Sequence, residues 1–328
     1  MTGRQLDLFP ARSPIGLAAE AAGLASLGRG MAPWVRLGTS SWSFPGWTGL
    51  VWDRPATPGQ LSRYGLAAYA RHPLLRTVGL DRTYYAPLDA AGFATLAEQT
   101  PADFRFLVKA PEDCTAPHFS NLERHGSRRG QRNARFLDAA WTTDVVVGPM
   151  RAGLAEQAGP LVFQFSPMPA AAVGGPERFA GRLHRFLGAL PRGPVYAVEV
   201  RTPALLTRAY AAALADAGAC HCLTAHPSMP DVETQAAAVA LDAAPAVVVR
   251  WMLGRGLSYE AGVTRYRPFD RLVDPDPSTR EAVARLCIVA ASARRPAFVV
   301  VNNKAEGSAP CSVVRLAERV AALARGAA

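Results

Sequence analysis

Residues 195–224, VYAVEVRTPALLTRAYAAALADAGACHCLT, contain the unit that decides the fold. Two short runs rich in apolar and β-branched residues, Val195–Arg201 and Cys220–Thr224, flank an alanine-rich segment of helical character. Thr202 and Pro203 are typical of a helix start, because proline fits the first helical turn. The pattern predicts a strand, a helix and a second strand that pairs in parallel with the first through a right-handed crossover.

The same alternation recurs along the chain. We expect strands at Val35–Thr39, Thr77–Asp81, Phe104–Ala110, Leu161–Phe165, Val195–Arg201, Cys220–Thr224, Ala246–Trp251 and Phe298–Asn302. Helical segments are expected near 58–71, 88–98, 131–141, 176–189, 203–217, 230–241, 278–294 and 312–325. This count predicts a (β/α)8 TIM-type barrel over residues 33–328. A doubly wound open sheet is the alternative, but the first strand ends in GTSSWS rather than a GxGxxG dinucleotide fingerprint.

Composition defines the protein class. The chain has 328 residues, of which 49% are hydrophobic, enough for a full-sized core. Residues 1–32 are punctuated by Gly, Ala and Pro and predict a flexible tail with at most one short helix near 17–27. The sequence shows neither a membrane-spanning apolar run nor a signal peptide, and its five scattered cysteines do not suggest a disulfide framework. We therefore expect a cytoplasmic protein without membrane partners.

The charge balance favours anionic partners. Lys and Arg number 36 against 26 Asp and Glu, a formal net charge of +10. Only Lys109 and Lys304 are lysine, so the basic character partly reflects an arginine-rich composition. Because lysine is so rare in this chain, Lys109 and Lys304 are of particular interest as functional residues.

Polar and charged residues concentrate where the predicted strands end. In barrels of this kind the active site lies at the C-terminal ends of the strands. We expect catalytic roles for Asp81, Lys109, Glu199, Arg201 and Asn302, and substrate contacts from Trp42, Tyr84, Gln164, His226, Arg250, Asn303 and Lys304. The alternative is a structural ring of ion pairs that closes the barrel mouth.

Specific roles follow from side-chain chemistry. Glu199 and Arg201 are two residues apart on one strand, so they share a face, and Val198 and Val200 then face the helices. Glu199 is our candidate acid or base, the cations hold phosphate or developing negative charge, and Asn302 orients the substrate. Lys109 is a general base or Schiff-base amine if burial lowers its pKa, or more simply a positive charge on an anion.

Cys220, His221, Cys222 and His226 suggest a zinc site at first sight. However, alternation along the strand places the two cysteines on one face and His221 on the other. No second CxxC or HxxxH pair completes four ligands. We expect neither a metal nor a cofactor.

A basic segment follows the third predicted strand. It carries Arg124, Arg128, Arg129, Arg132 and Arg135 with no acidic residue after Glu123. Such a loop can bind phosphates bidentately, which makes it a candidate nucleic-acid contact. The alternative is a solvated, mobile loop. Aromatic residues expected near the same face, such as Tyr85 and Trp251, suit a ring-bearing anionic ligand or ordinary packing.

Several stretches resemble one known family. GTSSWSFPGWTGLVWD at 38–53 resembles the opening signature of the YecE-like family, also called domain of unknown function 72. RTVGLDRTYYAPL, TPADFRFLVKAP, GPLVFQFSP, YAVEVR and FVVVNNKAEGSAP match further along, in order. The resemblance implies a TIM barrel but no reaction, because the family's activity is not established. The chain departs from the family at Gly79, where many members carry glutamate, and at Asp81, where asparagine is usual.

A second resemblance is short. Gln5, Leu6, Asp7, Leu8 and Phe9 are similar to the peptide with which bacterial polymerases and repair proteins bind the replication sliding clamp. In that interpretation Leu8 and Phe9 fill an apolar pocket and Gln5 fixes the register. The alternative is an amphipathic tail that folds back over the bottom of the barrel.

Three functions remain open. The first is an enzyme for an anionic, phosphate-bearing substrate, which includes nucleic acids. The second is a non-catalytic DNA-maintenance protein that the N-terminal peptide tethers to the sliding clamp. The third is a sugar-phosphate enzyme without a link to DNA.

Overall fold

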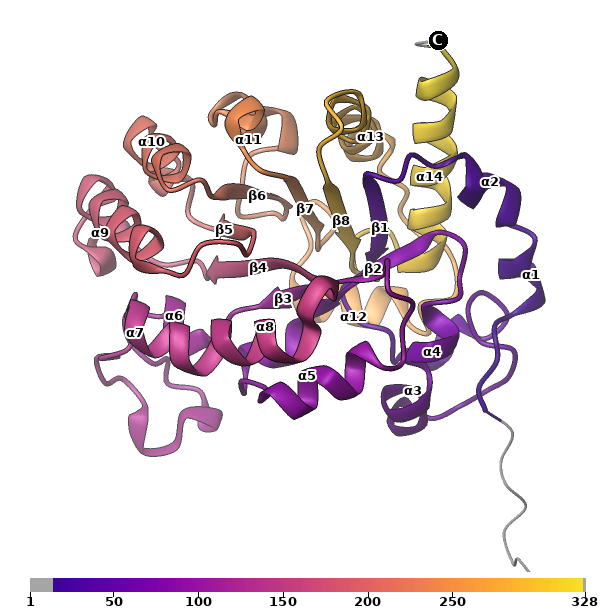
Figure 1. The fold of residues 1–328 in the computed structure, drawn as a ribbon, viewed down its shortest axis with the longest axis horizontal. Helices are drawn as coiled ribbons and strands as arrows, with labels where there is room; N and C mark the ends of the chain where they lie inside the picture. Colours follow the sequence, from indigo (N-terminus) through magenta and orange to yellow (C-terminus); the bar gives the residue numbers. More distant parts are fainter. Residues whose placement is uncertain (1–13, 327–328) are drawn as a thin grey trace, which may run out of the picture.

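Eight parallel strands close into a barrel in chain order, as the computed structural model of residues 14–326 shows (Figure 1). The strands are β1 Val35–Thr39, β2 Leu75–Leu80, β3 Arg105–Lys109, β4 Ala158–Phe165, β5 Tyr196–Val200, β6 Cys220–Ala225, β7 Val247–Trp251 and β8 Ala297–Val301. β8 pairs with β1, so the sheet has no open edge. The predicted (β/α)8 barrel is confirmed.

Helices form the outer layer. They are α3 Pro58–Tyr64, α4 Leu66–Tyr69, α5 Ala90–Ala97, α8 Gly148–Leu154, α9 Pro176–Ala189, α10 Arg208–Asp216, α11 Val232–Ala237, α13 Pro277–Ser292 and α14 Ala309–Gly326. Three further helices, α6 Glu112–Thr115, α7 Ala139–Thr142 and α12 Tyr259–Tyr266, belong to the long connections after β3 and β7. The connection after β7 provides five residues around the barrel mouth, and the connection after β3 provides Arg124.

The helix expected at 131–141 is wrong over most of its length. Only its last residues belong to a helix, α7, and Leu137 has a positive φ of 56°. The Asn133 side chain donates to the carbonyl oxygens of Asp113 and Ala116 at 2.8 and 2.7 Å. These hydrogen bonds hold the segment as a loop against α6, a competition that asparagine commonly wins over helix formation.

The strands bury both faces. Leu107, Val162, Ala197, Cys222, Val248 and Val300 form a cluster inside the barrel. Their neighbours in the sequence, such as Val198 and Val249, pack against the helices in a larger, separate cluster. This alternation sets the direction of every side chain further along each strand.

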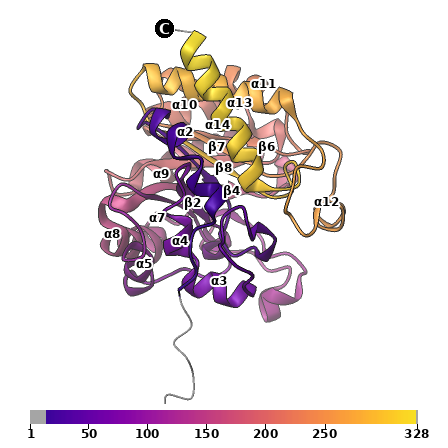
Figure 2. The same ribbon diagram turned by 90° about the vertical axis from the view of Figure 1, so that its right-hand side faces the viewer.

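Residues 14–32, which we expected to be part of a tail, form α1 Ala19–Ala22 and α2 Ala25–Gly30. Ile15 and Met31 are buried in the outer core. α2 lies beside α14 in two perpendicular views (Figures 1 and 2). Residues 14–32 therefore pack against the outside of the barrel and are not part of a free tail. The peptide Gln5–Phe9 lies outside the described residues.

Within residues 14–326, no helix combines the length and the apolar character needed to cross a lipid bilayer.

Candidate active site

A layer of polar side chains lies directly above the apolar interior of the barrel. Each member follows an inward-facing apolar residue by two positions: Lys109, Gln164, Glu199, Thr224, Arg250 and Asn302. Because alternate residues of a strand share a face, six strand ends turn these groups toward the barrel axis. The predicted parity of Glu199 against Val198 and Val200 is confirmed.

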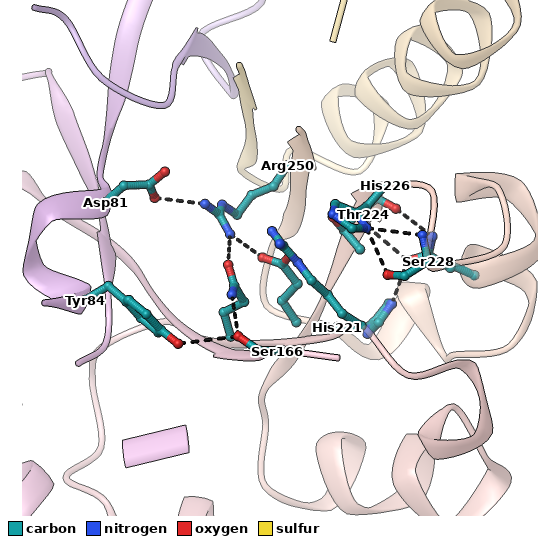
Figure 3. A network of polar contacts seen from close by, with 12 residues as sticks. Asp81, Tyr84, Ser166, His221, Thr224, His226, Ser228 and Arg250 are labelled. Carbon is teal, nitrogen blue, oxygen red and sulfur yellow. Dashed lines mark hydrogen bonds and ion pairs between the residues drawn. The ribbon is translucent and has the colours of Figure 1, made fainter. Parts of the chain in front are cut away.

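Arg250 is the centre of this layer (Figure 3). Its Nη1 donates to Gln164 Oε1 at 2.9 Å and to Glu199 Oε2, and its Nη2 donates to Asp81 Oδ1 at 2.8 Å. Arg201 Nε donates to the other carboxylate oxygen of Glu199 at 2.7 Å. One guanidinium thus connects three strand ends, from β2, β4 and β5.

The Glu199 carboxylate is fully buried and remains ionised. Burial alone would raise its pKa, but the Arg201 and Arg250 guanidiniums outweigh burial and hold the pKa well below its usual range. Both carboxylate oxygens accept hydrogen bonds from arginine. Glu199 therefore does not exchange protons near neutral pH, and the expected acid or base role does not match its surroundings.

A cavity of about 530 Å³ opens above this layer. It brings together nine of the residues predicted for catalysis or substrate binding: Asp81, Tyr84, Lys109, Gln164, Arg201, His226, Arg250, Asn302 and Lys304. Arg124, predicted as a nucleic-acid contact, lines the same cavity. Tyr85, Arg124, Ser166, Met252, Leu253, Leu257, Ser258 and Tyr259 complete the lining. Ser166 connects to the polar layer, because its Oγ lies 3.4 Å from Gln164 Nε2 and 3.3 Å from the Tyr84 hydroxyl.

Both lysines of the chain line this cavity. Lys109 is 8% exposed and its Nζ lies 3.7 Å from the centroid of the Tyr84 ring. Lys304 is 9% exposed and its Nζ lies 4.3 Å from the centroid of the Tyr259 ring. Within the part of the chain that the structure describes, neither ammonium forms an ion pair. Burial lowers the pKa of each lysine to about 8.

His226 reaches the cavity from the end of β6. Its Nδ1 accepts a hydrogen bond from the Ser228 backbone N–H at 3.2 Å and lies 2.8 Å from Ser228 Oγ. The neutral ring consequently carries its proton on Nε2. Burial, and then the nearby Arg201 charge, lower the pKa of His226 to about 4, so the imidazole is neutral at pH 7.

Two predicted substrate contacts lie elsewhere. Trp42 is 4% exposed, and its Nε1 donates to the Leu61 carbonyl at 3.1 Å inside the outer core. Asn303 Oδ1 accepts from Trp47 Nε1 at 3.0 Å and from the Ala309 backbone N–H at 2.8 Å. Asn303 therefore joins the loop after β1 to the start of α14, because its side chain points away from the barrel axis.

Gly79 occupies the inward position of β2 where the resemblance placed a glutamate. A Cβ atom added there would lie 3.2 Å from the Cα of Ser40. The close approach of β1 explains why the smallest residue fits this position.

The basic loop after β3 does not present a continuous row of free arginines. Arg124 pairs with Glu112 at 3.1 Å, and Arg128 and Arg135 pair with Asp113 at 3.1 and 3.3 Å. Arg129 Nε donates to the Gly126 carbonyl at 3.1 Å. Arg132 lines a different cavity. The acidic partners precede the loop on α6, so a sequence window that starts after them does not reveal the pairing.

The cysteine and histidine residues of β6 separate as predicted. Cys220 and Cys222 face the barrel interior, whereas His221 Nδ1 lies 2.8 Å from the Tyr210 hydroxyl in the outer layer. Among residues 14–326, no three His, Cys, Asp or Glu side chains are grouped as metal ligands.

Tyr259 was not among the predicted site residues, because no helix was predicted at Tyr259–Tyr266. The available signal was Ser258, whose side chain accepts from the Ala261 N–H as the N-cap of that helix. Tyr85, expected only as a nearby ring, is 70% exposed at the cavity rim.

Comparisons with known proteins agree with this architecture. The family model described as "Protein of unknown function DUF72" matches residues 36–327. A DUF72 family protein from Enterococcus faecalis V583 is 17% identical, with a TM-score of 0.57 over 87% of this chain and 95% of its own. A DUF72 family protein from Thermotoga maritima MSB8 is 20% identical, with a TM-score of 0.56 over 88% and 99%. The comparison with curated proteins gave no match. At such identities the structural likeness shows the fold alone, whereas the family model spans nearly the whole chain, which therefore belongs to the DUF72 family.

Proposed function

We propose that this protein is an enzyme that acts on a phosphate-bearing, ring-containing substrate bound in the cavity at the barrel mouth. One observation carries the proposal: in a chain whose other basic residues are all arginine, both lysines converge on this cavity without a carboxylate partner. An ammonium group that is buried and unpaired is costly, so a ligand anion is the natural counter-charge.

The charge balance of the cavity supports an anionic ligand. Asp81 and Glu199 are the carboxylates of the network, and Arg250 binds both of them. Arg201 adds a second guanidinium to Glu199. The carboxylates are thus satisfied by arginine, and the positive charge of the two lysines remains for the substrate.

Exposed rings support a substrate that carries a sugar or a base. Tyr85 and Tyr259 are 70% and 60% exposed, and both line the cavity. They belong to different connections, after β2 and after β7. Solvent-exposed tyrosines at a binding site offer flat surfaces on which a planar or cyclic group can stack.

The surroundings of each group suggest its role. Lys109, with a pKa of about 8, carries its charge at pH 7 and can also transfer a proton from Nζ. Glu199 positions the two arginines. Asn302 Nδ2 donates to Ser40 Oγ at 2.7 Å, and its Oδ1 accepts from the Lys304 backbone N–H at 3.0 Å. Asn302 therefore fixes the backbone that carries Lys304.

Calorimetric titration with adenosine 5′-monophosphate and ribose 5-phosphate tests ligand binding, with adenosine and ribose as phosphate-free controls. We expect only the phosphorylated compounds to bind, and Lys109→Met and Lys304→Met each to weaken binding at least tenfold. Arg315→Ala, which removes a charge from an exposed pair on α14, is the matched control. Binding that does not depend on phosphate or on the lysines would refute the proposal.

Turnover is tested separately. A pool of sugar phosphates and nucleotides is incubated with the protein and followed by phosphorus and proton NMR. A catalysed change should disappear in Lys109→Met while Arg315→Ala retains it. Lack of any change in a pool that contains a compound bound by the wild type would contradict the enzymatic part of the proposal.

A further inference from the structure

A second cavity lies between the loop after β3 and the start of α9. Its volume is about 550 Å³. The lining comprises Pro117, His118, Arg132, Asn133, Ala134, Phe136, Ala172, Val173, Gly174, Arg178 and Arg182. No acidic residue is among them, and none of them lines the cavity at the barrel mouth.

Three arginines of this cavity lack acidic partners. Within residues 14–326, Arg132, Arg178 and Arg182 form no ion pair, whereas Arg128 and Arg135 of the neighbouring loop both pair with Asp113. The Arg182 guanidinium is held over the Phe136 ring, 4.6 Å from its centroid. Positive charge is therefore gathered at one place and left uncompensated by the protein.

The backbone at the start of α9 positions Arg178. A Cβ added to Gly174 would lie 2.6 Å from Arg178 Cδ, so the arginine stem packs directly on this glycine. Gly174 has a φ of +82°, a left-handed conformation that glycine adopts without strain. Both properties favour glycine at this position.

The same helix start adds positive potential. Gly175 is the N-cap of α9 and provides no side-chain hydrogen bond to the first turn. A helix N-terminus carries partial positive charge, which Glu177 in the first turn complements and Arg178 in the same turn opposes. An anion in the cavity would offset both the helix dipole and the arginine charges.

We propose that this second cavity, lined by Arg132, Arg178 and Arg182, binds a phosphate group. Guanidinium groups match the oxygens of phosphate in bidentate geometry, and three of them exceed what a singly charged carboxylate needs. Burial is the main cause that lowers the pKa of Arg182, and repulsion from Arg178, Arg132 and Arg185 lowers it further. A bound dianion would relieve the repulsive part. The inference does not rest on the function proposed for the barrel mouth, because the two cavities share no residue.

Calorimetric titration with pyrophosphate at low ionic strength tests the site. The titration uses the Lys109→Met/Lys304→Met protein, in which the cavity at the barrel mouth has lost both of its unpaired ammonium groups. Binding to this protein therefore reports on the second cavity. We expect this protein to bind one equivalent of pyrophosphate, and the added pair Arg132→Ala/Arg182→Ala to weaken binding at least tenfold. Arg315→Ala removes a charge from the exposed face of α14, far from the lining of this cavity, and we expect less than a twofold effect.

The wild-type chain provides the same test if the lysine variant does not fold. Arg132→Ala/Arg182→Ala should then remove one binding equivalent and leave any lysine-dependent one. A ten-nucleotide single strand without terminal phosphates, measured in parallel, distinguishes a phosphodiester from a terminal phosphate as the bound group. Absence of pyrophosphate and oligonucleotide binding, or equal weakening by Arg315→Ala, would overturn the proposal, whatever the result at the barrel mouth.

Discussion

Arg250 and Glu199 form an ion pair inside the barrel, with 1% and 0% of their side chains exposed. The pair connects β7 to β5 across the mouth of the barrel, and Arg250 Nη2 extends the connection to Asp81. Both side chains are almost completely buried, and their charges are balanced by each other and by Asp81 and Arg201. The consequence is that neither partner can be removed alone without leaving a buried charge.

We expect Glu199→Gln to lower the free energy of unfolding by about 3–5 kcal/mol, the typical cost of breaking a buried ion pair by removing one partner. Asp81→Asn should cost only about 1 kcal/mol, because Asp81 is 31% exposed and solvent screens the loss. Urea denaturation measures both variants. Equal losses would contradict the role of Glu199 as the buried anchor of the network.

The same carboxylate predicts a pH dependence of stability. The pKa of Glu199 is depressed in the folded state, so the unfolded chain, with an ordinary glutamate pKa of about 4.3, takes up the proton first. Its stabilising contribution is present above about pH 4.3 and is lost as the pH falls toward the folded-state pKa. The stability difference between wild type and Glu199→Gln should therefore shrink between about pH 5 and 3 in urea titrations. If the stability difference stayed constant over this pH range, ionisation of Glu199 would not be the source of its stabilising effect.

The two lysines offer a direct measurement. In protein labelled with ¹³C-lysine, two Cε signals should titrate near pH 8, because burial lowers the pKa of Lys109 and Lys304. Lys304→Met assigns them. Anion affinity should fall as the pH rises through about 8, since the ammonium charges are then lost. Signals that titrate near 10.4, the ordinary lysine value, would contradict the buried setting of the amines.

Asn303 should matter for stability rather than for binding. Asn303→Ala leaves Trp47 Nε1 and the Ala309 N–H without their acceptor, at a cost of about 2 kcal/mol. Urea denaturation followed by tryptophan fluorescence measures this loss. A phosphate ligand should bind the variant with unchanged affinity under conditions where it is folded. Weaker phosphate binding by the folded variant would indicate that Asn303 contributes to the binding site after all.

The N-terminal peptide is tested by deletion. We expect removal of residues 1–12 to abolish binding to a bacterial sliding clamp in surface plasmon resonance and to leave the midpoint of urea unfolding unchanged. Leu8→Ala/Phe9→Ala should reproduce the loss in the full-length chain. Clamp binding that survives both changes would eliminate the tether.

Local patterns in the sequence are enough to predict the barrel and most of its polar mouth. Strand positions follow from local hydrophobic patterns, and the two-residue period then fixes which side chains point inward, as Glu199 and Arg250 illustrate. Closure of the sheet turns those positions toward one axis, so a list of strand ends approximates the cavity. The helix at 176–189 could be predicted for the same reason, because its apolar face and its N-terminal proline are local features of the sequence.

Which charged side chains pair with one another could not be predicted from local patterns. Glu199 is only two residues from Arg201 in the sequence, but its second partner, Arg250, lies 51 residues away. Asn302 and Asn303 cannot be told apart from the sequence. Asn302 contacts Ser40, just after β1 at the barrel mouth, whereas Asn303 binds Trp47 in the outer layer. Likewise Arg128 is neutralised by Asp113 while Arg132 joins Arg178 and Arg182 at the second cavity. Local patterns show which way a side chain leaves the backbone, but its pairing and burial depend on contacts between distant segments, which exist only after the chain has folded.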